Sequence, residues 1–404
     1  MNYLESTHST TSTQQPLLTS NRLSDQKIQS IATRAAASVE HLVCFSHLRW
    51  KFVYQRPQHL LSRASRQWHI WFVEEPMYGD ECRLDVCHVT DTLSVVVPHL
   101  AHGTNPEETI QCQRELVDQL LKQQNINEFI AWYYTPMALA FSNHLRPRLT
   151  VYDCMDELSA FHGAPPSLIA QEKSLLKQAD VVFTGGISLY EAKQAKHPRV
   201  FAFPSSIDHV HFAESRQALA DPADMSHIEG PRIGFCGVID ERLNLDLLRG
   251  LAERRPDWQF VLLGPVVKID PATLPQGPNL HYLGMKSYEE LPSYFGNWNA
   301  AIMPFAINDA TRYISPTKTP EYLAAGLPVV STPIRDVIRT YGSMPHVLIA
   351  DSVYPFEQAL DKQLSNCPTD WTMVDAYLRE NTWDNTWVTM QRIMQSQLSV
   401  VAEQ

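Results

Sequence analysis

The chain has 404 residues, 44% of them hydrophobic and 19% charged, which is the composition of a globular protein with room for two or three domains. Its net charge of −11 leaves no overall basic excess to neutralise phosphates, so we expect no nucleic-acid partner. The seven cysteines include no C-x-x-C pair, and the sequence shows neither an apolar run of membrane-spanning length nor a secretion signal. We therefore expect a cytoplasmic protein, with contact to a membrane surface left open.

The first residues, 1–38, are rich in Ser, Thr and Gln and show no sustained hydrophobic periodicity, which predicts a disordered tail. Over 39–210, short apolar runs alternate with helical patterns such as 56–67 and 106–124. That alternation is typical of a parallel sheet covered by helices on both faces. The runs of strand length are 41–47, 69–76, 93–100, 128–135, 149–155, 179–186 and 199–206.

The segment 211–230 breaks this rhythm because it is polar and acidic, and we interpret it as a linker. The alternation restarts over 231–380, which predicts a second domain of the same kind. We therefore expect an α/β protein with two doubly wound Rossmann-like domains and a ligand in the cleft at the carboxyl ends of their strands. The runs in the second domain are 232–239, 258–265, 279–284, 299–305, 327–333 and 346–350.

The last segment, 381–404, has the pattern of an amphipathic helix. Its large apolar residues recur at spacings of three or four, which places them on one face of the helix. Such a stripe is usually core packing, so we predict a helix that packs back toward the N-terminal domain. The stripe consists of Trp383, Trp387, Met390, Met394 and Leu398.

Several common catalytic and nucleotide-binding motifs are absent from the sequence. No G-x-G-x-x-G follows a strand, so a dinucleotide dehydrogenase has little support. No G-x-x-x-x-G-K-[ST] phosphate loop, G-x-S-x-G nucleophile turn or H-E-x-x-H zinc helix occurs. No Asp-x-Asp pair occurs either, which weakens any mechanism in which a metal ion bridges a diphosphate. We therefore expect no metal and no resident cofactor.

Charged residues gather after two strands of the first domain. His47, Arg49 and Arg56 follow the first strand and form a basic patch, which suits anion or substrate binding and a solvated turn about equally. Asp153 and Asp156 lie at the end of a later strand, where chemistry usually happens in α/β domains. Asp156 is the stronger candidate for taking a proton from an attacking hydroxyl, and a structural role for either carboxylate is the alternative.

The second domain offers a candidate anion site. Gly237 permits close backbone approach after the first strand of this domain, and Arg242 follows on the same loop. Later, "ISPTKTPEYLAAGLPVVSTP" places Lys318 before a Thr-Pro helix start and Glu321 just inside the helix, which Gly326 ends. A capped helix explains this segment taken alone. The joint occurrence of such signals at several strand ends favours a phosphate site.

The order of these segments resembles that of the GT-B glycosyltransferases of the group-1 or family-4-like class, and more narrowly a bacterial subgroup of teichuronic-acid and exopolysaccharide type. The likeness runs from about residue 41 to the end and includes "FSHLRWKFVYQRPQHLLSR", "VYDCMDELSAF", "GFCGVIDERLNLDLL" and "SPTKTPEYLAAGLPVVSTP". It implies metal-independent transfer of a sugar from a UDP- or GDP-sugar to a glycan or lipid-linked acceptor in cell-surface polysaccharide or glycoconjugate synthesis. It also leaves open a peripheral position at the inner face of the membrane.

The resemblance further implies roles for individual residues. Glu321 would accept hydrogen bonds from the ribose hydroxyls, the base would lie beside Gly284, and Asp156 would be the catalytic group. The residues that would hold or adjoin the diphosphate are Ser315, Thr317, Lys318, Arg242 and Gly237. The residues that would line the opposite wall of the cleft are His47, Arg49, Arg56 and Asp153.

The sequence departs from this family at one position. Retaining members usually carry a Glu-x7-Glu pair, and the residue eight positions before Glu321 is Tyr313. Retention or inversion of the anomeric configuration therefore stays open, although a basic carboxylate at Asp156 favours inversion by direct displacement. Two other functions also stay open: a nucleotide-sugar epimerase or hydrolase of the same fold, and a non-catalytic nucleotide-binding partner.

Overall fold

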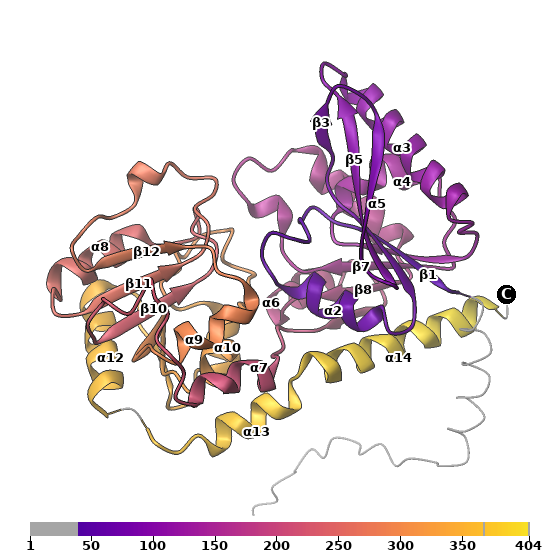
Figure 1. Cartoon of the computed structure of the whole chain (residues 1–404). Helices are drawn as coiled ribbons and strands as arrows, with labels where there is room; N and C mark the ends of the chain where they lie inside the picture. The colour runs from indigo at the N-terminus through magenta and orange to yellow at the C-terminus, as the bar shows by residue number, and fades with distance from the viewer. Residues whose placement is uncertain (1–38, 367, 403–404) are drawn as a thin grey trace, which may run out of the picture.

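The computed structural model describes residues 39–366 and 368–402, so the predicted disordered tail, 1–38, lies outside the described residues. The chain forms two α/β domains that lie side by side, one coloured indigo to magenta and the other mainly orange in Figure 1. Each domain contains a largely parallel sheet with helices packed against it. The predicted fold class, two doubly wound Rossmann-like domains, is therefore confirmed.

The N-terminal sheet is parallel except at one edge. Its strands run in the order β3-β5-β2-β1-β6-β7-β8-β9, and β4 pairs antiparallel with β5. Sequence patterns missed β3 and β4, because their side chains are mostly exposed and supply no apolar run. The strands are β1 (His41–Phe45), β2 (His69–Val73), β3 (Met77–Gly79), β4 (Arg83–Thr90), β5 (Leu93–Ala101), β6 (Phe129–Tyr133), β7 (Leu149–Cys154), β8 (Val181–Thr184) and β9 (Val200–Ala202).

Side chains of the N-terminal sheet alternate between two buried layers. On β1, Leu42 and Cys44 belong to one apolar cluster, whereas Val43 and Phe45 belong to the other. Both faces of the sheet are therefore covered. The helices of this domain are α2 (Arg56–Ala64), α3 (Pro106–Gln123), α4 (Leu139–Ser142), α5 (Ser167–Gln178) and α6 (Ile187–Lys193), with the 3-10 turns η1 (Pro136–Ala138) and η2 (Leu158–Ala160).

The C-terminal sheet is parallel throughout, in the order β12-β11-β10-β13-β14-β15. Its strands are β10 (Arg232–Cys236), β11 (Gln259–Leu263), β12 (Leu280–Gly284), β13 (Ala300–Met303), β14 (Val329–Ser331) and β15 (Val347–Ile349). Its helices are α8 (Leu245–Arg254), α9 (Leu291–Phe295), α10 (Lys318–Ala324), α11 (Arg335–Tyr341), α12 (Val353–Asn366) and α13 (Thr372–Glu380), with the 3-10 turns η4 (Pro271–Thr273) and η5 (Tyr288–Glu290).

The segment interpreted as a linker packs into the C-terminal domain. It contains most of α7 (His209–Ala213) and all of the 3-10 turn η3 (Glu214–Arg216). Phe212, Met225 and Ile228 are buried in the core of that domain. These three apolar residues are spaced too widely to form a periodic pattern, so the polar composition around them dominated the sequence signal.

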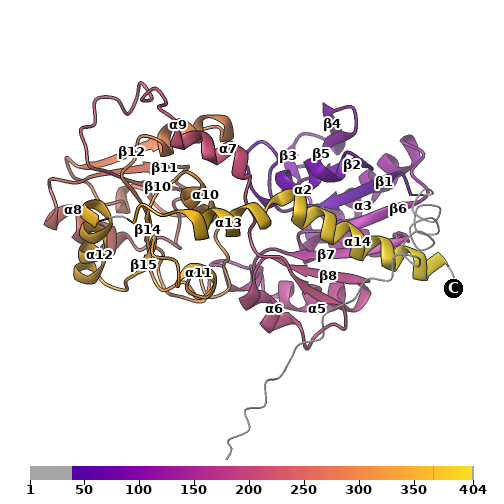
Figure 2. The same ribbon diagram turned by 90° about the horizontal axis from the view of Figure 1, so that it is seen from below.

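The final helix, α14 (Trp383–Ala402), leaves the C-terminal domain and runs beneath the N-terminal one (Figure 2). It closes one face of the N-terminal sheet. All five residues of the predicted stripe are buried in the same cluster as Leu42 and Cys44, so their role in packing is confirmed. Trp387 contacts the rings of both Trp68 and Trp132, with centroids 5.9 and 6.3 Å away.

The chain crosses between the domains twice, and the two crossings are hydrogen-bonded to each other. The Ile207 N–H donates to the carbonyl of Asn381 at 3.0 Å, and the Trp383 N–H donates to the carbonyl of Ile207 at 3.2 Å. The hydroxyls of Ser206 and Thr386 lie 2.6 Å apart beside them. The domains are therefore joined by a short paired segment.

We expect Trp387→Ala to lower the free energy of unfolding by about 3–5 kcal/mol, because it removes a buried aromatic and leaves a cavity between α14 and the sheet. Urea unfolding followed by tryptophan fluorescence and circular dichroism measures the change. Val388→Ala, at an exposed neighbour, should stay within about 0.5 kcal/mol of the parent. Equal stabilities for the two variants would contradict the packing role of α14.

Candidate active site between the two domains

The two domains bring opposite charges together around Phe161, which lies on the N-terminal-domain loop that follows β7. The guanidinium carbon of Arg242 lies 5.6 Å from the centre of this ring, and Nζ of Lys268 lies 5.3 Å from it. Both cations belong to the C-terminal domain, where they follow β10 and β11. Cation–π contacts of this kind hold the two side chains at the boundary between the domains.

Arg242 is fixed by a carboxylate of its own loop. Its Nε and Nη2 donate to both oxygens of Asp240 at 2.8 to 3.1 Å, so the pair is bidentate. Among the described residues, its Nη1 donates to no acceptor in a hydrogen bond. Burial alone would lower the pKa of Arg242, but the neighbouring carboxylates outweigh it and raise the pKa. Arg242 is thus a permanent cation with one nitrogen available to a ligand.

Asp156 faces this pair of cations from the other domain. Within residues 39–366 and 368–402, its carboxylate forms no hydrogen bond and no ion pair. Burial raises the pKa of Asp156, and the charges of Arg242, Arg56 and Lys268 lower it only in part. A carboxylate with a raised pKa and no fixed partner, at a domain boundary, is suited to accept a proton.

Lys193 on α6 anchors the loop that carries Asp156. The side chain of Lys193 is fully buried, and its Nζ contacts Glu157 at 2.7 Å and Glu172 at 2.6 Å. The hydroxyl of Tyr152 also donates to Glu172. Because Glu157 is the next residue after Asp156, this buried network fixes the backbone on which the candidate base lies.

Lys318 and Glu321 form a buried ion pair at the start of α10. Nζ of Lys318 lies 2.5 Å from Oε2 of Glu321, which is 3% exposed. Burial raises the pKa of Glu321, and Lys318 opposes that shift. Burial alone would lower the pKa of Lys318, but the charge of Glu321 outweighs it and raises the pKa. The two side chains assigned to different parts of a nucleotide are therefore direct partners here.

The helix α10 begins earlier than the sequence pattern predicts. It starts at Lys318, before the Thr-Pro pair, and Thr317 occupies the position just outside it. Its predicted end is confirmed, because Gly326 has a φ of +80°, a conformation that favours glycine. With only seven residues, α10 has a modest dipole, so Lys318 is the principal positive charge at this place.

Three glycines line up at the carboxyl edge of the C-terminal sheet. Gly237, Gly264 and Gly284 follow or end the adjacent strands β10, β11 and β12. The Gly264 N–H donates to the carbonyl of Gly284 at 2.8 Å, and a Cβ on Gly264 would lie 1.8 Å from the carbonyl oxygen of Gly237. Gly264, which sequence reasoning did not single out, is therefore required for the strand ends to approach so closely.

Aromatic side chains from both domains cover this edge. Tyr54, from the turn before α2, stacks on Tyr288 with ring centroids 4.3 Å apart, and His211 stacks on Tyr288 at the same distance. A cavity of about 50 Å³ remains between Tyr54, Gly237, Gly264 and Lys318. Ligand sites usually measure about 300–1,000 Å³, so this cavity is too small to hold a nucleotide.

His47 and Arg49, predicted to line the cleft, have different surroundings. Burial, assisted by the charge of Lys268, lowers the pKa of His47 to about 4, so its imidazole is neutral near pH 7. Lys268 belongs to the C-terminal domain, which places His47 at the boundary. Arg49 is partly exposed and is held by Glu74 at 3.0 Å and by the carbonyl of Pro76 at 3.3 Å.

The prediction that Arg56 and Asp153 line the cleft is wrong. Their side chains are 4% and 0% exposed, and Nε and Nη2 of Arg56 bond the Asp153 carboxylate at 2.8 to 3.1 Å. Nη1 of Arg56 donates to the carbonyl of Phe203. A buried pair of this kind is a structural element, because its hydrogen-bonding groups are already occupied and neither side chain is free to bind a ligand. It joins the start of α2 to the end of β7.

Ser315, assigned to the diphosphate, contacts the other domain. Its carbonyl accepts a hydrogen bond from the Ser205 hydroxyl at 2.5 Å. Close by, the buried carboxylate of Asp336 accepts bonds from the N–H and hydroxyl of Ser188 at 3.1 and 2.5 Å. A Cβ on Gly186 would lie 2.4 Å from this carboxylate. These contacts hold the domains in their present orientation.

Sequence reasoning missed Lys268, Phe161, Tyr54 and Tyr288. Lys268 follows a predicted strand, so its position was a usable signal, whereas the aromatic residues gave none, because aromatic residues are equally common in cores. Among the described residues, no three His, Cys, Asp or Glu side chains are arranged to hold a metal ion. No helix in the described part of the chain is both long and apolar enough to cross a membrane.

Comparisons with known proteins agree with this architecture. No protein-family model matches the chain. A protein of Bacillus subtilis (strain 168) named "Putative teichuronic acid biosynthesis glycosyltransferase TuaH" is 25% identical over 217 residues. This alignment covers 50% of the present chain and 54% of the relative, so the chain spans about half the length of the curated relative it matches.

Solved structures resemble nearly the whole chain. Sucrose-phosphate synthase from Thermosynechococcus elongatus has a TM-score of 0.67 at 13% identity, covering 89% of this chain and 100% of that one. An E. coli trehalose-6-phosphate structure bound with UDP-2-fluoro glucose has a TM-score of 0.66 at 13% identity, covering 88% and 99%. A UDP-forming trehalose-phosphate synthase from Burkholderia xenovorans, in complex with glucose-6-phosphate, has a TM-score of 0.63 at 10% identity, covering 88% and 100%. The chain therefore has the GT-B fold.

We expect Lys193→Met to lower the free energy of unfolding by about 3–5 kcal/mol, because it leaves Glu157 and Glu172 without their buried counter-ion. Adding Glu172→Gln should recover part of the loss, since one of the two carboxylates is then neutral. Lys196→Met, on an exposed neighbour, is the control. Chemical denaturation measures all three variants, and a Lys193→Met protein as stable as the control would contradict the anchoring role.

Proposed function

We propose that the protein is a glycosyltransferase that moves a sugar from a nucleotide-diphosphate sugar to a hydroxyl acceptor in cell-surface polysaccharide or glycoconjugate synthesis, without a metal ion or resident cofactor. One observation carries the proposal: two cations of the C-terminal domain, Arg242 and Lys268, contact Phe161 of the N-terminal domain, and both act electrostatically on Asp156, a carboxylate of that domain with no hydrogen-bond partner among the described residues. The name of the Bacillus subtilis relative and the substrates of the structural neighbours support the same reaction class.

In this proposal the C-terminal domain holds the donor. The free nitrogen of Arg242, together with Lys268 and Lys318, would neutralise the diphosphate, and Glu321 would accept hydrogen bonds from the ribose. The close strand ends at Gly237, Gly264 and Gly284 leave backbone, rather than side chains, facing the nucleotide. Ser315 and Thr317 would adjoin the diphosphate once the interdomain contacts loosen.

The chemistry follows from the placement of these charges. The acceptor oxygen attacks the anomeric carbon, a carbon–oxygen bond to the acceptor forms, and the bond to the donor phosphate oxygen breaks. Asp156 takes the proton of the attacking hydroxyl, and the electron pair of the broken bond leaves with the nucleoside diphosphate. Because that group gains negative charge in the transition state, cations fixed beside it lower the barrier.

Donor entry requires the domains to separate. The cavity of about 50 Å³ is bounded by Tyr54 on one side and by C-terminal-domain residues on the other, so its volume depends on the distance between the domains. Release of the ion pair between Lys318 and Glu321 would then free a cation for phosphate and a carboxylate for ribose. The protein would act in the cytoplasm, and its acceptor would be either free or attached to a lipid carrier at the inner face of the membrane. The acceptor would enter the site from the side of the N-terminal domain.

Binding and turnover of the donor test the function. Thermal unfolding is measured with UDP, GDP and their sugars, since a ligand that binds only the folded state raises the unfolding temperature. Donor consumption is then followed with and without acceptor mixtures. A transferase consumes donor only with acceptor, an epimerase or hydrolase converts donor alone, and a binding protein shows a shift without turnover. No shift with any nucleotide would overturn the proposal.

We expect Asp156→Asn to reduce transfer by at least two orders of magnitude while leaving nucleotide binding intact. Because the base works only when ionised and its pKa is raised, the parental rate should fall on the acid side at a higher pH than for an ordinary aspartate. The variant should lose this acid limb, and at pH 7 it should be at least as stable as the parent, since a costly buried charge is gone.

The control is Asp91→Asn, an exposed carboxylate far from the site. Kinetics from pH 4 to 8, together with urea unfolding at pH 7, separate a chemical from a structural role. A folded Asp156→Asn protein that transfers sugar at the parental rate would rule out Asp156 as the base.

We expect Lys318→Ala to lower turnover tenfold or more, because its charge stabilises the leaving diphosphate in the transition state. Lys362→Ala removes an exposed lysine and serves as the matched control. Steady-state kinetics with the identified donor measure the effect. Unchanged turnover in a folded Lys318→Ala protein would remove this residue from the donor site.

A further inference from the structure

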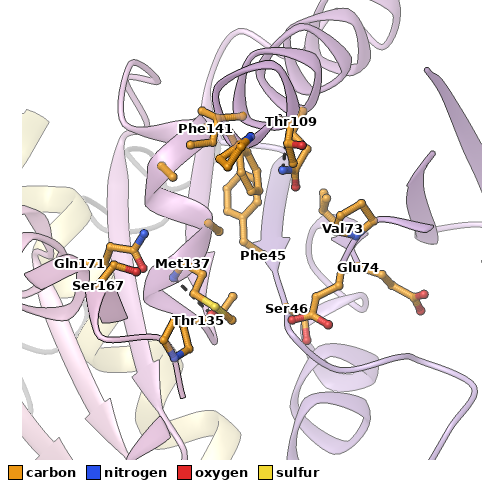
Figure 3. Close-up of a pocket in the computed structure, with 18 of the residues that line it drawn as sticks. Phe45, Ser46, Val73, Glu74, Thr109, Thr135, Met137, Phe141, Ser167 and Gln171 are labelled. Atoms are coloured by element: carbon orange, nitrogen blue, oxygen red, sulfur yellow. Dashed lines mark hydrogen bonds between the residues drawn. The ribbon is translucent and has the colours of Figure 1, made fainter. Parts of the chain in front are cut away.

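A second cavity lies inside the N-terminal domain, apart from the donor residues. Its volume is about 590 Å³, which is in the range of small-molecule sites. It opens at the carboxyl edge of the sheet. Phe45 ends β1 and Val73 ends β2, Ser46 and Glu74 come directly after them, and Thr135 follows β6. Figure 3 shows Ser46, Val73 and Glu74 on one side of an open space, and Thr135 on the other side with Ser167 of α5.

The walls of this cavity are largely apolar. Phe45 and Phe141 meet edge to face with ring centroids 5.9 Å apart, and Met137 and Ile110 extend the apolar surface. Ile110 is 36% exposed, so apolar surface continues to the mouth. Such a surface favours a ligand with an aliphatic or aromatic group.

The charges of the residues that line the cavity indicate whether it suits a neutral or a phosphorylated ligand. No Lys, Arg or His is among the described residues that line the cavity, whereas Glu74 and Glu75 are. Glu74 is already bonded to Arg49 and to the Trp50 N–H at 3.0 and 2.7 Å. The cation beside the cavity, Arg49, is therefore already paired with Glu74, and the described lining itself offers a phosphate carboxylates and no cation, which is electrostatically unfavourable.

One polar group of the wall lacks a partner. Oε1 of Gln171, on α5, is buried and accepts no hydrogen bond from any residue that the structure describes. Figure 3 shows Gln171 and Ser167 on the side of the cavity opposite Val73 and Glu74. A ligand hydroxyl would satisfy this buried acceptor, and neutral polar contacts of this kind suit a sugar without charge.

The cavity adjoins the candidate active site. Ser46 precedes His47, and Pro165 and Ser167 end the loop that carries Asp156. The charge of Lys268 affects one carboxylate in the cavity and one in the candidate active site. Burial raises the pKa of Glu75 and of Asp156, and the positive charge of Lys268 opposes both shifts. The cavity therefore lies at the same edge of the sheet as the loop that carries the proposed base.

Resting on the proposed function, we infer that this cavity receives the acceptor, and that the part of the acceptor inside it is an uncharged sugar or polyol bearing an apolar group. The apolar group lies against Phe45 and Phe141, and a hydroxyl bonds Gln171. Sugar phosphates, such as the glucose-6-phosphate in the Burkholderia xenovorans structure, are disfavoured, because the described lining holds carboxylates and no cation and the neighbouring Arg49 is paired with Glu74.

Direct binding of two probes tests this inference. Saturation-transfer NMR and isothermal titration compare 4-nitrophenyl β-D-glucoside, a neutral aryl glycoside, with glucose 6-phosphate on the full-length protein. We expect the aryl glycoside to bind and glucose 6-phosphate to bind at least tenfold more weakly. Ala140→Trp, which fills the cavity from α4, should weaken binding of the aryl glycoside at least tenfold, and Ile110→Glu should do the same at a partly exposed position that tolerates charge.

The control is Ile169→Trp, an exposed position on α5 outside the cavity, which should leave binding unchanged. UDP and GDP binding is measured on the same variants, so that failure of the donor site is seen separately. Tighter binding of glucose 6-phosphate, no binding of the aryl glycoside up to millimolar concentration, or binding unaffected by both Ala140→Trp and Ile110→Glu would overturn the inference.

Discussion

The structure depends on one constraint: the two chain segments that join the domains are hydrogen-bonded to each other. Ile207 and Asn381 pair where the chain first leaves and later re-enters the N-terminal domain, and α14 then secures the return by burying its apolar stripe against the N-terminal sheet. Because both connections lie at one place, the carboxyl edges of the two sheets are held facing each other. The meeting of Asp156 with Arg242 follows from this arrangement, and neither domain could produce it alone.

The fold was largely predictable because buried strands appear in the sequence as short runs of apolar residues. Every apolar run that we predicted to be a strand contains one, and Gly326 marks the end of α10 as expected. The exposed strands β3 and β4 were not predicted, because they contain no such apolar run. The interpretation of 211–230 as a linker failed for a related reason, since a few well-placed residues such as Phe212 anchor a polar segment.

The candidate site was only partly predictable, because charge alone does not tell whether a side chain has a partner. Arg56 and Asp153 were candidates for the cleft alongside Arg242 and Asp156, yet the first two are hydrogen-bonded to each other in the interior. The role of Lys268 depends on Phe161, a residue 107 positions away that only the domain packing brings to it. Whether a charged side chain is paired with another depends on the tertiary structure. A single sequence therefore cannot distinguish charged residues that form internal ion pairs from those that are free to bind a ligand.

The contact between Asp336 and Ser188 has a consequence for how the domains move. When the domains part, the carboxylate and the Ser188 groups that it bonds are both returned to water, so the net free energy lost is about 1.5–3 kcal/mol for bonds to a charged group. A difference of that size is comparable to what a ligand gains from preferring one of two conformations. Under the proposed function, the contact between Asp336 and Ser188 is therefore weak enough for binding of the donor to set the balance between open and closed forms.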